Sequence, residues 1–207
     1  NTAEIGMLGL LIGIVFGTVI ATTRVIPRTN PVAKFFSGLS GLYVGLFRGT
    51  PIVVQLLVFY YVLMPLMNLH MNSVAVAVVV FGMNSAAYIS EIMRAGILSV
   101  DSGQMEGGRA IGLNYATTMM KIVIPQAVKN ILPTLGNEFI SLIKETSVVS
   151  FVGAMDLYVA FNRIGSNSYE FMIPYLVMAL IYIVIVLVIT LGIKLMERSL
   201  RKSDKSI

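Results

Sequence analysis

The chain has 207 residues, of which 57% are hydrophobic and 12% are charged, and its formal net charge at pH 7 is +5. A soluble globular domain carries about 25% charged residues, so this composition excludes a protein that faces water on all sides. The absence of cysteine and the presence of a single histidine exclude disulfides, thiolate catalysis and clustered zinc ligands. We expect an all-α integral membrane protein that binds no metal ion.

The first predicted span covers residues 5–23, which carry no charge and are long enough to cross a bilayer core of about 30 Å. Four glycines recur in it at spacings of three and four and share one helical face: Gly6, Gly9, Gly13 and Gly17. Small residues in such a row let membrane helices approach closely, which predicts packing inside a bundle. Because the sequence starts at Asn1 without methionine, we expect the natural N-terminus to be incomplete.

Residues 24–50 carry four basic side chains and no acid, and Pro27 and Pro31 interrupt any continuous helix there. The amphipathic part at 32–47 predicts a short or interfacial helix. Further spans are expected at about 51–67 and 73–89, with a short turn at 68–72 between them.

The second half of the chain begins with a long polar loop at 101–125 between apolar runs. A fourth span is predicted at 126–150, although several polar and charged groups interrupt it, and these must face protein or water rather than lipid. A polar connection at 153–168 leads to the last span at 173–195, and a basic tail follows. We therefore interpret residues 1–207 as a single membrane domain with about five transmembrane helices.

The basic residues predict the orientation of these spans. Five crossings place residues 24–50, the polar loop and the tail on one side, which collects nearly all Lys and Arg outside the spans. The positive-inside rule therefore puts the loop and the C-terminal tail in the cytoplasm. Since the positive charge lies at the span ends, it indicates membrane orientation and contact with anionic lipid, and we expect no nucleic-acid partner.

The polar loop has a regular spacing. Glu106, Gly107 and Gly108 are followed by Gly112, and nine residues later by Ile122-Val123-Ile124-Pro125. Residues 110–120 contain good helix formers, and Gly112 and Pro125 mark the two ends of this stretch. The pattern predicts a short cytoplasmic helix that fits a groove on a partner protein.

This loop resembles the conserved cytoplasmic loop of ABC importer permeases, in which Glu-Ala-Ala precedes a glycine, nine residues and Ile-x-Leu-Pro. Glycines replace both alanines here, and Ile124 stands for leucine. More specifically, the chain resembles permeases of polar amino acid uptake, the histidine, glutamine and arginine transporter group. The matching strings are Arg48-Gly49-Thr50-Pro51 with Gln55, Asn84-Ser85-Ala86-Ala87-Tyr88 with Glu91, Leu135-Gly136-Asn137-Glu138, and Lys144-Glu145-Thr146-Ser147.

The resemblance implies the fold of a type I ABC importer permease with a cytoplasmic coupling helix. It implies a bacterial plasma (inner) membrane location, a second permease subunit that is identical or closely related, cytoplasmic ATPase subunits, and an external or fused amino-acid-binding protein. Its ATPase-coupling residues would be Glu106, Gly107, Gly108, Arg109, Ala110, Gly112, Ile122 and Pro125. Because the sequence has no Gly-x-x-x-x-Gly-Lys-Ser/Thr loop, we expect a transport subunit rather than an enzyme, with ATP and Mg²⁺ held by the partner chain.

Candidate substrate contacts lie on two spans. Asn84 and Tyr88 share a helical face with Glu91, and Asn84 and Ser85 offer both donors and acceptors to a zwitterion. Such residues also form hydrogen bonds between helices. Glu138 and Ser141 repeat the pattern on the fourth span, where an ionisable group inside the membrane indicates function. Glu138 could attract the ammonium group of any amino acid or the side chain of a cationic one.

Other polar residues have gating or structural interpretations. Arg48 is expected to anchor the start of the second span, with a gating role also open, and Gln55 and Glu91 are placed in the same group. Lys144 and Glu145 pair either with each other or with the neighbouring subunit. Asp156 either lines the outer mouth of the pathway, as a further substrate contact, or caps a local helix.

The predicted function is that of a permease subunit in an ATP-driven importer for a polar or charged amino acid, of the glutamine/glutamate or arginine/histidine/lysine class. An ion-coupled secondary transporter or channel, with Glu138 and Glu145 as coupling groups, is the alternative. A structural scaffold would not explain the acids of the fourth span.

Overall fold

The longest helices of the computed structural model, which describes residues 1–26 and 30–204, could each cross a membrane alone. They are α1 (Thr2–Val25), α5 (Ser73–Leu98) and α10 (Met172–Asp204). All regular elements among the described residues are helical, with no strand. The all-α prediction is therefore confirmed.

The centre of the bundle is the pair of α1 and α5, and the glycine face of α1 makes their close packing possible. A Cβ atom added at Gly13 would lie 2.7 Å from Ser85 Oγ and 3.0 Å from Ile89 Cδ1, and one at Gly9 would lie 3.2 Å from Phe81 Cβ. Phe81 and Ile89 are fully buried. The predicted packing role of these glycines is confirmed.

We expect Gly13→Val to lower the thermal midpoint of the detergent-solubilised protein, because overpacking a helix contact of this kind costs about 1–3 kcal/mol. Gly45→Val is the matched control, since no atom lies within 4 Å of a Cβ added there. Both changes put valine inside a helix, so the intrinsic propensity effect is the same. Equal midpoints for the two variants would contradict this role of Gly13.

The predicted second span at 51–67 is one limb of a broken helix. The chain forms α2 (Pro31–Gly49), α3 (Ile52–Val58), a π-helical turn η1 (Phe59–Leu63) and α4 (Met64–Leu66). The two limbs meet at an angle of 105° and have the length and apolarity of a span only together. The short helix predicted at 32–47 corresponds to α2, which ends at Gly49 because Thr50 and Pro51 adopt extended conformations before α3 begins.

The polar loop contains a helix, but at a different place from the predicted one. Helix α6 covers Ser102–Ala110 and ends where Gly112 adopts φ +92°, a conformation that favours glycine. The predicted helix at 110–120 is therefore wrong. A second helical segment begins at α7 (Tyr115–Thr118) and continues through a π-helical turn η2 (Met119–Val123) into α8 (Ile124–Glu145).

Pro125 lies inside this continuous helical segment and does not end it, contrary to the sequence-based expectation. A proline lacks the N–H group that would bond to the preceding turn. The wide π turn at η2 lies immediately before it, where such turns accommodate a break in the regular bonding.

The C-terminal end of α8 continues as a 3₁₀ helix, η3 (Thr146–Val152), and then bends by 56° into α9 (Leu157–Ser168). The region predicted as a polar connection at 153–168 is thus largely helical. Helix α10 returns along α8. The two helices pack closely at Gly136, where an added Cβ atom would lie only 2.5 Å from Ile193 Cγ1.

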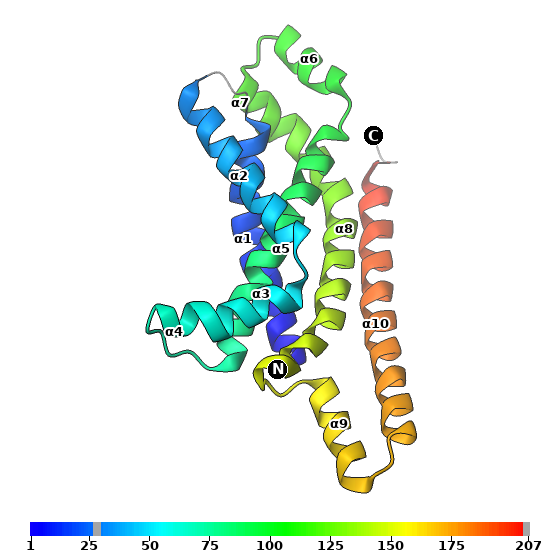
Figure 1. The fold of residues 1–207 in the computed structure, drawn as a ribbon. Coiled ribbons are helices and arrows are strands. Elements are labelled where there is room, and N and C mark those ends of the chain that lie inside the picture. Colours follow the sequence, from blue (N-terminus) through cyan, green and yellow to red (C-terminus); the bar gives the residue numbers. More distant parts are fainter. Residues whose placement is uncertain (27–29, 205–207) are drawn as a thin grey trace.

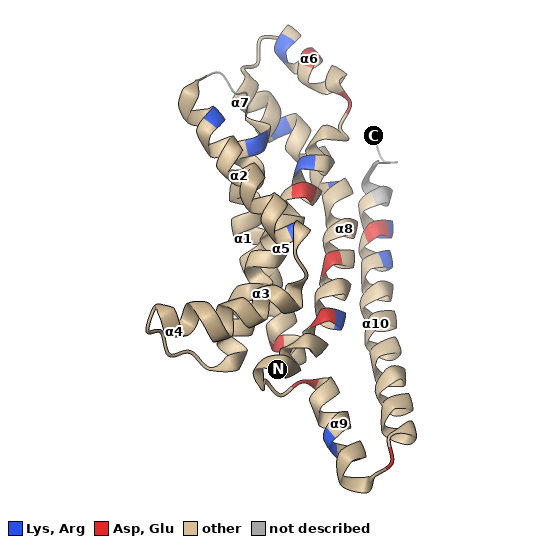
Figure 2. Ribbon diagram, in the orientation of Figure 1, with Lys and Arg blue, Asp and Glu red and all other residues tan. Residues whose placement is uncertain are grey.

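Figure 1 shows the N- and C-termini at opposite ends of the bundle, with α6 at the same end as the C-terminus. The ribbon segments of Lys and Arg residues gather toward that end in Figure 2, whereas the α3–α4 limb carries none. The charge asymmetry that the sequence indicates is therefore also present in space.

Candidate translocation site

A hydrogen bond between a serine and a glutamate joins α5 to α8. The Ser85 hydroxyl of α5 donates to Glu138 Oε1 of α8 at 3.1 Å. Ser85 is fully buried and Glu138 is partly buried. The charges that act on this carboxylate include the Arg48 guanidinium and the Glu145 carboxylate. The structure thus brings together two of the predicted substrate contacts.

The break between α2 and α3 is held by side-chain amides. Gln55 Nε2 donates to the carbonyl oxygens of Phe47 at 2.8 Å and Thr50 at 3.0 Å, which lie at the break. Asn84 Nδ2 donates to Gln55 Oε1 at 3.0 Å and to the Phe47 carbonyl at 3.3 Å. Gln55 and Asn84 are 7% and 4% exposed. Of the two interpretations given for Asn84, substrate contact and hydrogen bonding between helices, the structure shows the second.

We expect Asn84→Ala to destabilise the protein by about 1–3 kcal/mol, because Gln55 Oε1 would lose its only buried donor in this network. The measurement is the thermal or denaturant midpoint in detergent. Asn137→Ala is the control, since the Asn137 side chain is exposed. If the two variants have the same midpoint, the amide network does not stabilise the bend.

Arg48 lies at the end of α2, next to this network. Its guanidinium carbon lies 5.2 Å from the centroid of the Tyr88 ring on α5, within the range of a cation–π contact. The Arg48 side chain is exposed, and Tyr88 is half-buried. A cation is therefore held beside the Ser85–Glu138 pair, where it remains accessible to a ligand.

Glu91 occupies a different cluster, one to two turns along α5. It pairs with Arg24 of α1 and with Arg94, whose Nη2 lies 3.2 Å from Glu91 Oε2. This arrangement ties the C-terminal parts of α1 and α5 together. Sequence reasoning did not assign Arg24 or Arg94 to this cluster, although Arg94 lies three residues beyond Glu91 on one helical face.

The remaining candidates on α8 lie further toward its outer end. Ser141 is half-buried, and Lys144 and Glu145 are exposed. The structure does not bring them into the hydrogen-bonded groups around Glu138 and Asn84.

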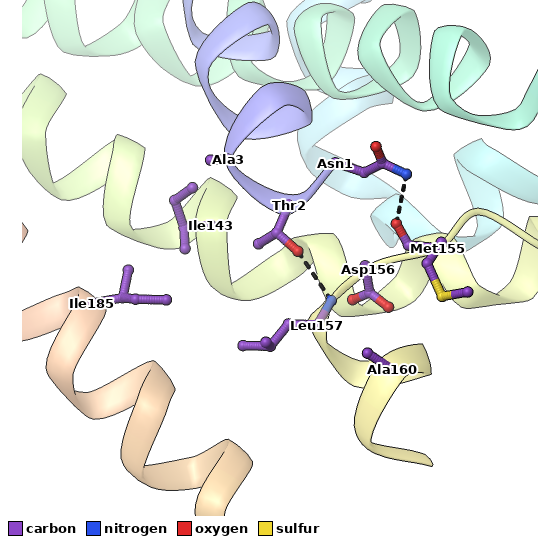
Figure 3. A pocket seen from close by; sticks show the side chains of 9 residues that line it. All are labelled: Asn1, Thr2, Ala3, Ile143, Met155, Asp156, Leu157, Ala160 and Ile185. Atoms are coloured by element: carbon purple, nitrogen blue, oxygen red, sulfur yellow. Dashed lines mark hydrogen bonds between the residues drawn. The ribbon is translucent and has the colours of Figure 1, made fainter. Parts of the chain in front are cut away.

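Asp156 caps a helix and also lines a cavity of about 450 Å³. Its Oδ1 accepts the Val159 N–H at 2.8 Å at the start of α9, and the residue is 5% exposed. Figure 3 shows it between the start of α1 and the α9 helix, with Ile143 and Ile185 across the cavity. Asp156 therefore caps α9, one of the two interpretations left open for it, and its position beside a cavity is compatible with the other, a place at the mouth of the pathway. It lies away from Glu138.

The proposed coupling residues are distributed over α6, the turn that follows it, η2 and the start of α8. Helix α6 carries Glu106, Gly107, Gly108, Arg109 and Ala110, of which only Gly108 is buried. A Cβ at Gly108 would lie 2.5 Å from Thr118 Cγ2, whereas a Cβ at Gly107 would meet nothing within 4 Å. Gly112 forms the turn, Ile122 belongs to η2 and Pro125 to α8.

The coupling segment also contains features that the sequence did not single out. Ile111 is 77% exposed beside the turn at Gly112, and Gln104 of α6 is bonded to Gln126 of α8 at 3.1 Å. In the sequence, Ile111 looks like one more apolar residue, and its exposure depends on the turn that Gly112 forms.

Comparison with known proteins decides the family. Residues 9–202 match the profile of the binding-protein-dependent transport system inner membrane component family. The chain belongs to this family. It is therefore a non-enzymatic permease subunit of an ABC transporter, as the sequence motifs predicted.

Individual relatives agree with this assignment. The chain is 36% identical to the arginine transport system permease protein ArtQ of Bacillus subtilis, covering 98% of this chain and 90% of ArtQ. It is 34% identical to the putative glutamine transport system permease protein GlnP of Rickettsia prowazekii, covering 96% and 89%. A crystal structure of an amino acid ABC transporter with histidines superimposes with a TM-score of 0.88, at 37% identity, over 96% of this chain and 90% of that one.

These similarities confirm the type I ABC importer permease fold and the amino acid ABC permease function. Family membership implies ATPase and binding-protein partners in general, and an inner membrane location. None of the similarities supports an ion-coupled secondary transporter.

Proposed function

We propose that the chain forms one half of the pathway through which an ATP-driven importer carries a polar or charged amino acid. The observation that carries this proposal is the presence of two opposite charges that act on each other, Glu138 on α8 and Arg48 at the end of α2. Glu138, held by Ser85, supplies a carboxylate, and Arg48, placed beside Tyr88, supplies a guanidinium. A zwitterionic amino acid needs a partner for its ammonium group and another for its carboxylate.

The broken α2–α3 helix positions this site. Because Gln55 and Asn84 bind the carbonyl groups at the break, Arg48 is held at a fixed place next to α5. Broken helices that expose polar groups at membrane depth are typical of substrate sites in transporters. Tyr88, which contacts Arg48, is a further candidate contact, and Ser141 follows Glu138 by three residues on α8. Asp156 lies apart, at the cavity between α1 and α9.

We infer that the α6 end of the bundle is cytoplasmic and docks on an ATPase subunit that holds ATP and Mg²⁺. The basic residues near that end support this orientation, since Lys and Arg are enriched on the cytoplasmic side of membrane proteins. An external or fused binding protein would deliver the amino acid at the opposite end, and a second permease subunit would supply the other half of the pathway.

The test is uptake into proteoliposomes that contain the permease with its ATPase and binding protein. Arginine and glutamine, the cargo named for two relatives, are the first substrates to assay, followed by histidine, lysine and glutamate. Uptake should require ATP and persist when ion gradients are collapsed. Uptake that follows a proton or sodium gradient without ATP would contradict the proposal.

A further inference from the structure

A buried carboxylate at the joint between η3 and α9 is only partly satisfied. Asp156 is 5% exposed, and its Oδ1 accepts the Val159 N–H at 2.8 Å. Its Oδ2 is also buried, but it accepts no hydrogen bond of good geometry from the described part of the chain. Within residues 1–26 and 30–200 it forms no ion pair, although the Asn1 amino group acts on it from a greater distance. Because a buried charged oxygen without a partner is costly, we expect another group to bind it.

A second buried oxygen lies near this carboxylate. The hydroxyl of Tyr182 on α10 is buried and makes no hydrogen bond of good geometry within the described residues. Asp156 and Thr146 are the groups that act on it. Ile185 lies one turn further along the same face of α10 and lines the cavity beside Asp156. Two oxygens that can each accept a hydrogen bond thus lie at this joint.

The joint lies deep in the membrane. The Tyr175 hydroxyl donates to Asn162 Oδ1 at 2.8 Å near the turn between α9 and α10. At the other end of α9, Asp156 and Ile185 line the same cavity, so the two helices are antiparallel neighbours. Ile185 lies about 20 Å along α10 from its start, near the centre of the stretch 171–193, which contains no charged residue. An ionisable group at this depth indicates function, and a lipid headgroup, which lies about 15 Å from the bilayer centre, does not reach it.

The cavity beside Asp156 has the size and lining of a small-molecule site. Its volume is about 450 Å³, and its walls come from α1, α8, α9 and α10. Figure 3 shows the carboxylate among mainly apolar side chains, which include Ala3, Ile143, Leu157 and Ile185. Sites for small molecules are typically apolar with a few polar groups. Hard metal ions such as Ca²⁺ and Mg²⁺ take about six or more oxygen ligands, which such a lining does not supply.

We propose that this cavity binds a small organic cation with a primary ammonium group and a short apolar body. The ammonium group, which has three N–H donors, would donate to Asp156 Oδ2 and to the Tyr182 hydroxyl, while the apolar body lies against the walls. Ile143, which lines the cavity, lies about 140° around α8 from Glu138. The site is therefore separate from the Ser85–Glu138 pair, and the inference does not depend on the proposed function. Since four helices form the walls, an occupied site would hold them in the observed arrangement.

Binding of radiolabelled n-butylammonium to the purified complex of permease and ATPase tests the proposal by equilibrium dialysis in detergent. We expect one bound ion per permease chain. Asp156→Asn should weaken binding by about tenfold or more, because it keeps an acceptor for the Val159 N–H but removes the charge. Asp101→Asn is the matched control and should bind as the unaltered complex does. Asp101 also caps a helix, through the Gly103 N–H at 2.7 Å, but is exposed.

Competition shows which chemistry the site recognises. Ethylammonium should displace the label, whereas tetramethylammonium, which has no N–H donor, and sodium should not. Displacement by sodium at equal concentration would identify a metal site and overturn the proposal. Equal affinity in Asp156→Asn and the unaltered complex would also overturn it. If Glu138→Gln abolishes binding and Asp156→Asn does not, the amine binds at the translocation site, and the proposal fails.

A variant that fills the cavity keeps the test independent of the charge. Ala160 lines the cavity, so Ala160→Leu should weaken n-butylammonium binding by about tenfold or more. It should also abolish the rise in thermal midpoint that the amine gives the unaltered complex, since only a ligand that binds the folded state stabilises it. Ala179→Leu, at an exposed position of α10, is the control and should retain both effects. Unchanged affinity in Ala160→Leu would show that the amine does not occupy this cavity.

Discussion

Replacement of Gly108 by valine is expected to separate ATP hydrolysis from transport, whereas Gly107→Val is expected to retain most of the coupling. A Cβ atom at Gly108 would lie 2.5 Å from Thr118 Cγ2 and 3.2 Å from Ile122 Cδ1. Thr118 is fully buried and β-branched, so it has little freedom to move. The added side chain therefore pushes α6 away from the segment formed by α7 and η2. If movement of α6 is passed to the spans, it would pass through this segment, which continues into α8.

The effect should be large because α6 has few other contacts with the bundle. Overpacking of this size costs about 1–3 kcal/mol, which corresponds to about a 5- to 150-fold loss of correctly placed α6. The measurement is the ratio of amino acid taken up to ATP hydrolysed in proteoliposomes. Gly107→Val is the matched control, since nothing lies within 4 Å of its added Cβ. Equal ratios for the two variants would show that α6 is not held through Gly108.

Glu138→Gln is expected to reduce uptake by about 10- to 150-fold, because a hydrogen bond to a charged group contributes about 1.5–3 kcal/mol. Glutamine keeps an acceptor for the Ser85 hydroxyl but removes the negative charge that would bind the ammonium group. The loss should be larger for a cationic amino acid than for glutamine if the carboxylate binds the side chain. If the two losses are equal, it binds the α-ammonium group.

Ser85→Ala tests whether the charge of Glu138 or the position of its carboxylate matters more for uptake. It removes the 3.1 Å hydrogen bond to Glu138 but leaves the carboxylate in place, so we expect a smaller loss than for Glu138→Gln. Binding of labelled amino acid to the detergent-purified complex should follow the same order. Unchanged uptake and affinity in Glu138→Gln would remove Glu138 from the site.

The fold could be predicted where a simple pattern, such as an uncharged stretch or a regular spacing of glycines, has one physical interpretation. The uncharged length of residues 5–23 and the glycine spacing on it predicted both a span and its packed face, and the structure places Gly13 against Ser85. Acidic residues in a span were equally informative, because their cost in lipid requires a partner. Ser85 and Glu138 were each selected as candidate substrate contacts, whereas the hydrogen bond between them depends on tertiary packing and could not be predicted.

The bends could not be predicted, because prolines and glycines show where a helix is weakened but not whether it stops. Pro51 follows a break of 105°, whereas Pro125 lies within a continuous helix. The difference depends on distant groups: Gln55 and Asn84 bind the freed carbonyls at the first position, and a wide turn absorbs the second. The amide of Asn84 looks in the sequence like a ligand for substrate, while the structure uses it to support the bend.

The wide turn η2 has a consequence for the permitted length of the chain. Met119–Val123 contains one residue more per turn than a regular helix would. Because the extra residue is absorbed within one turn, deleting it would restore ordinary winding and change the direction of the preceding residues little. A deletion in the regular part of α8 would instead rotate everything before it by about 100° around the helix axis and draw it about 1.5 Å closer. Helix α6 would then point to a different side of the bundle. The wide turn is thus the place at which the segment between α6 and α8 tolerates a change in length.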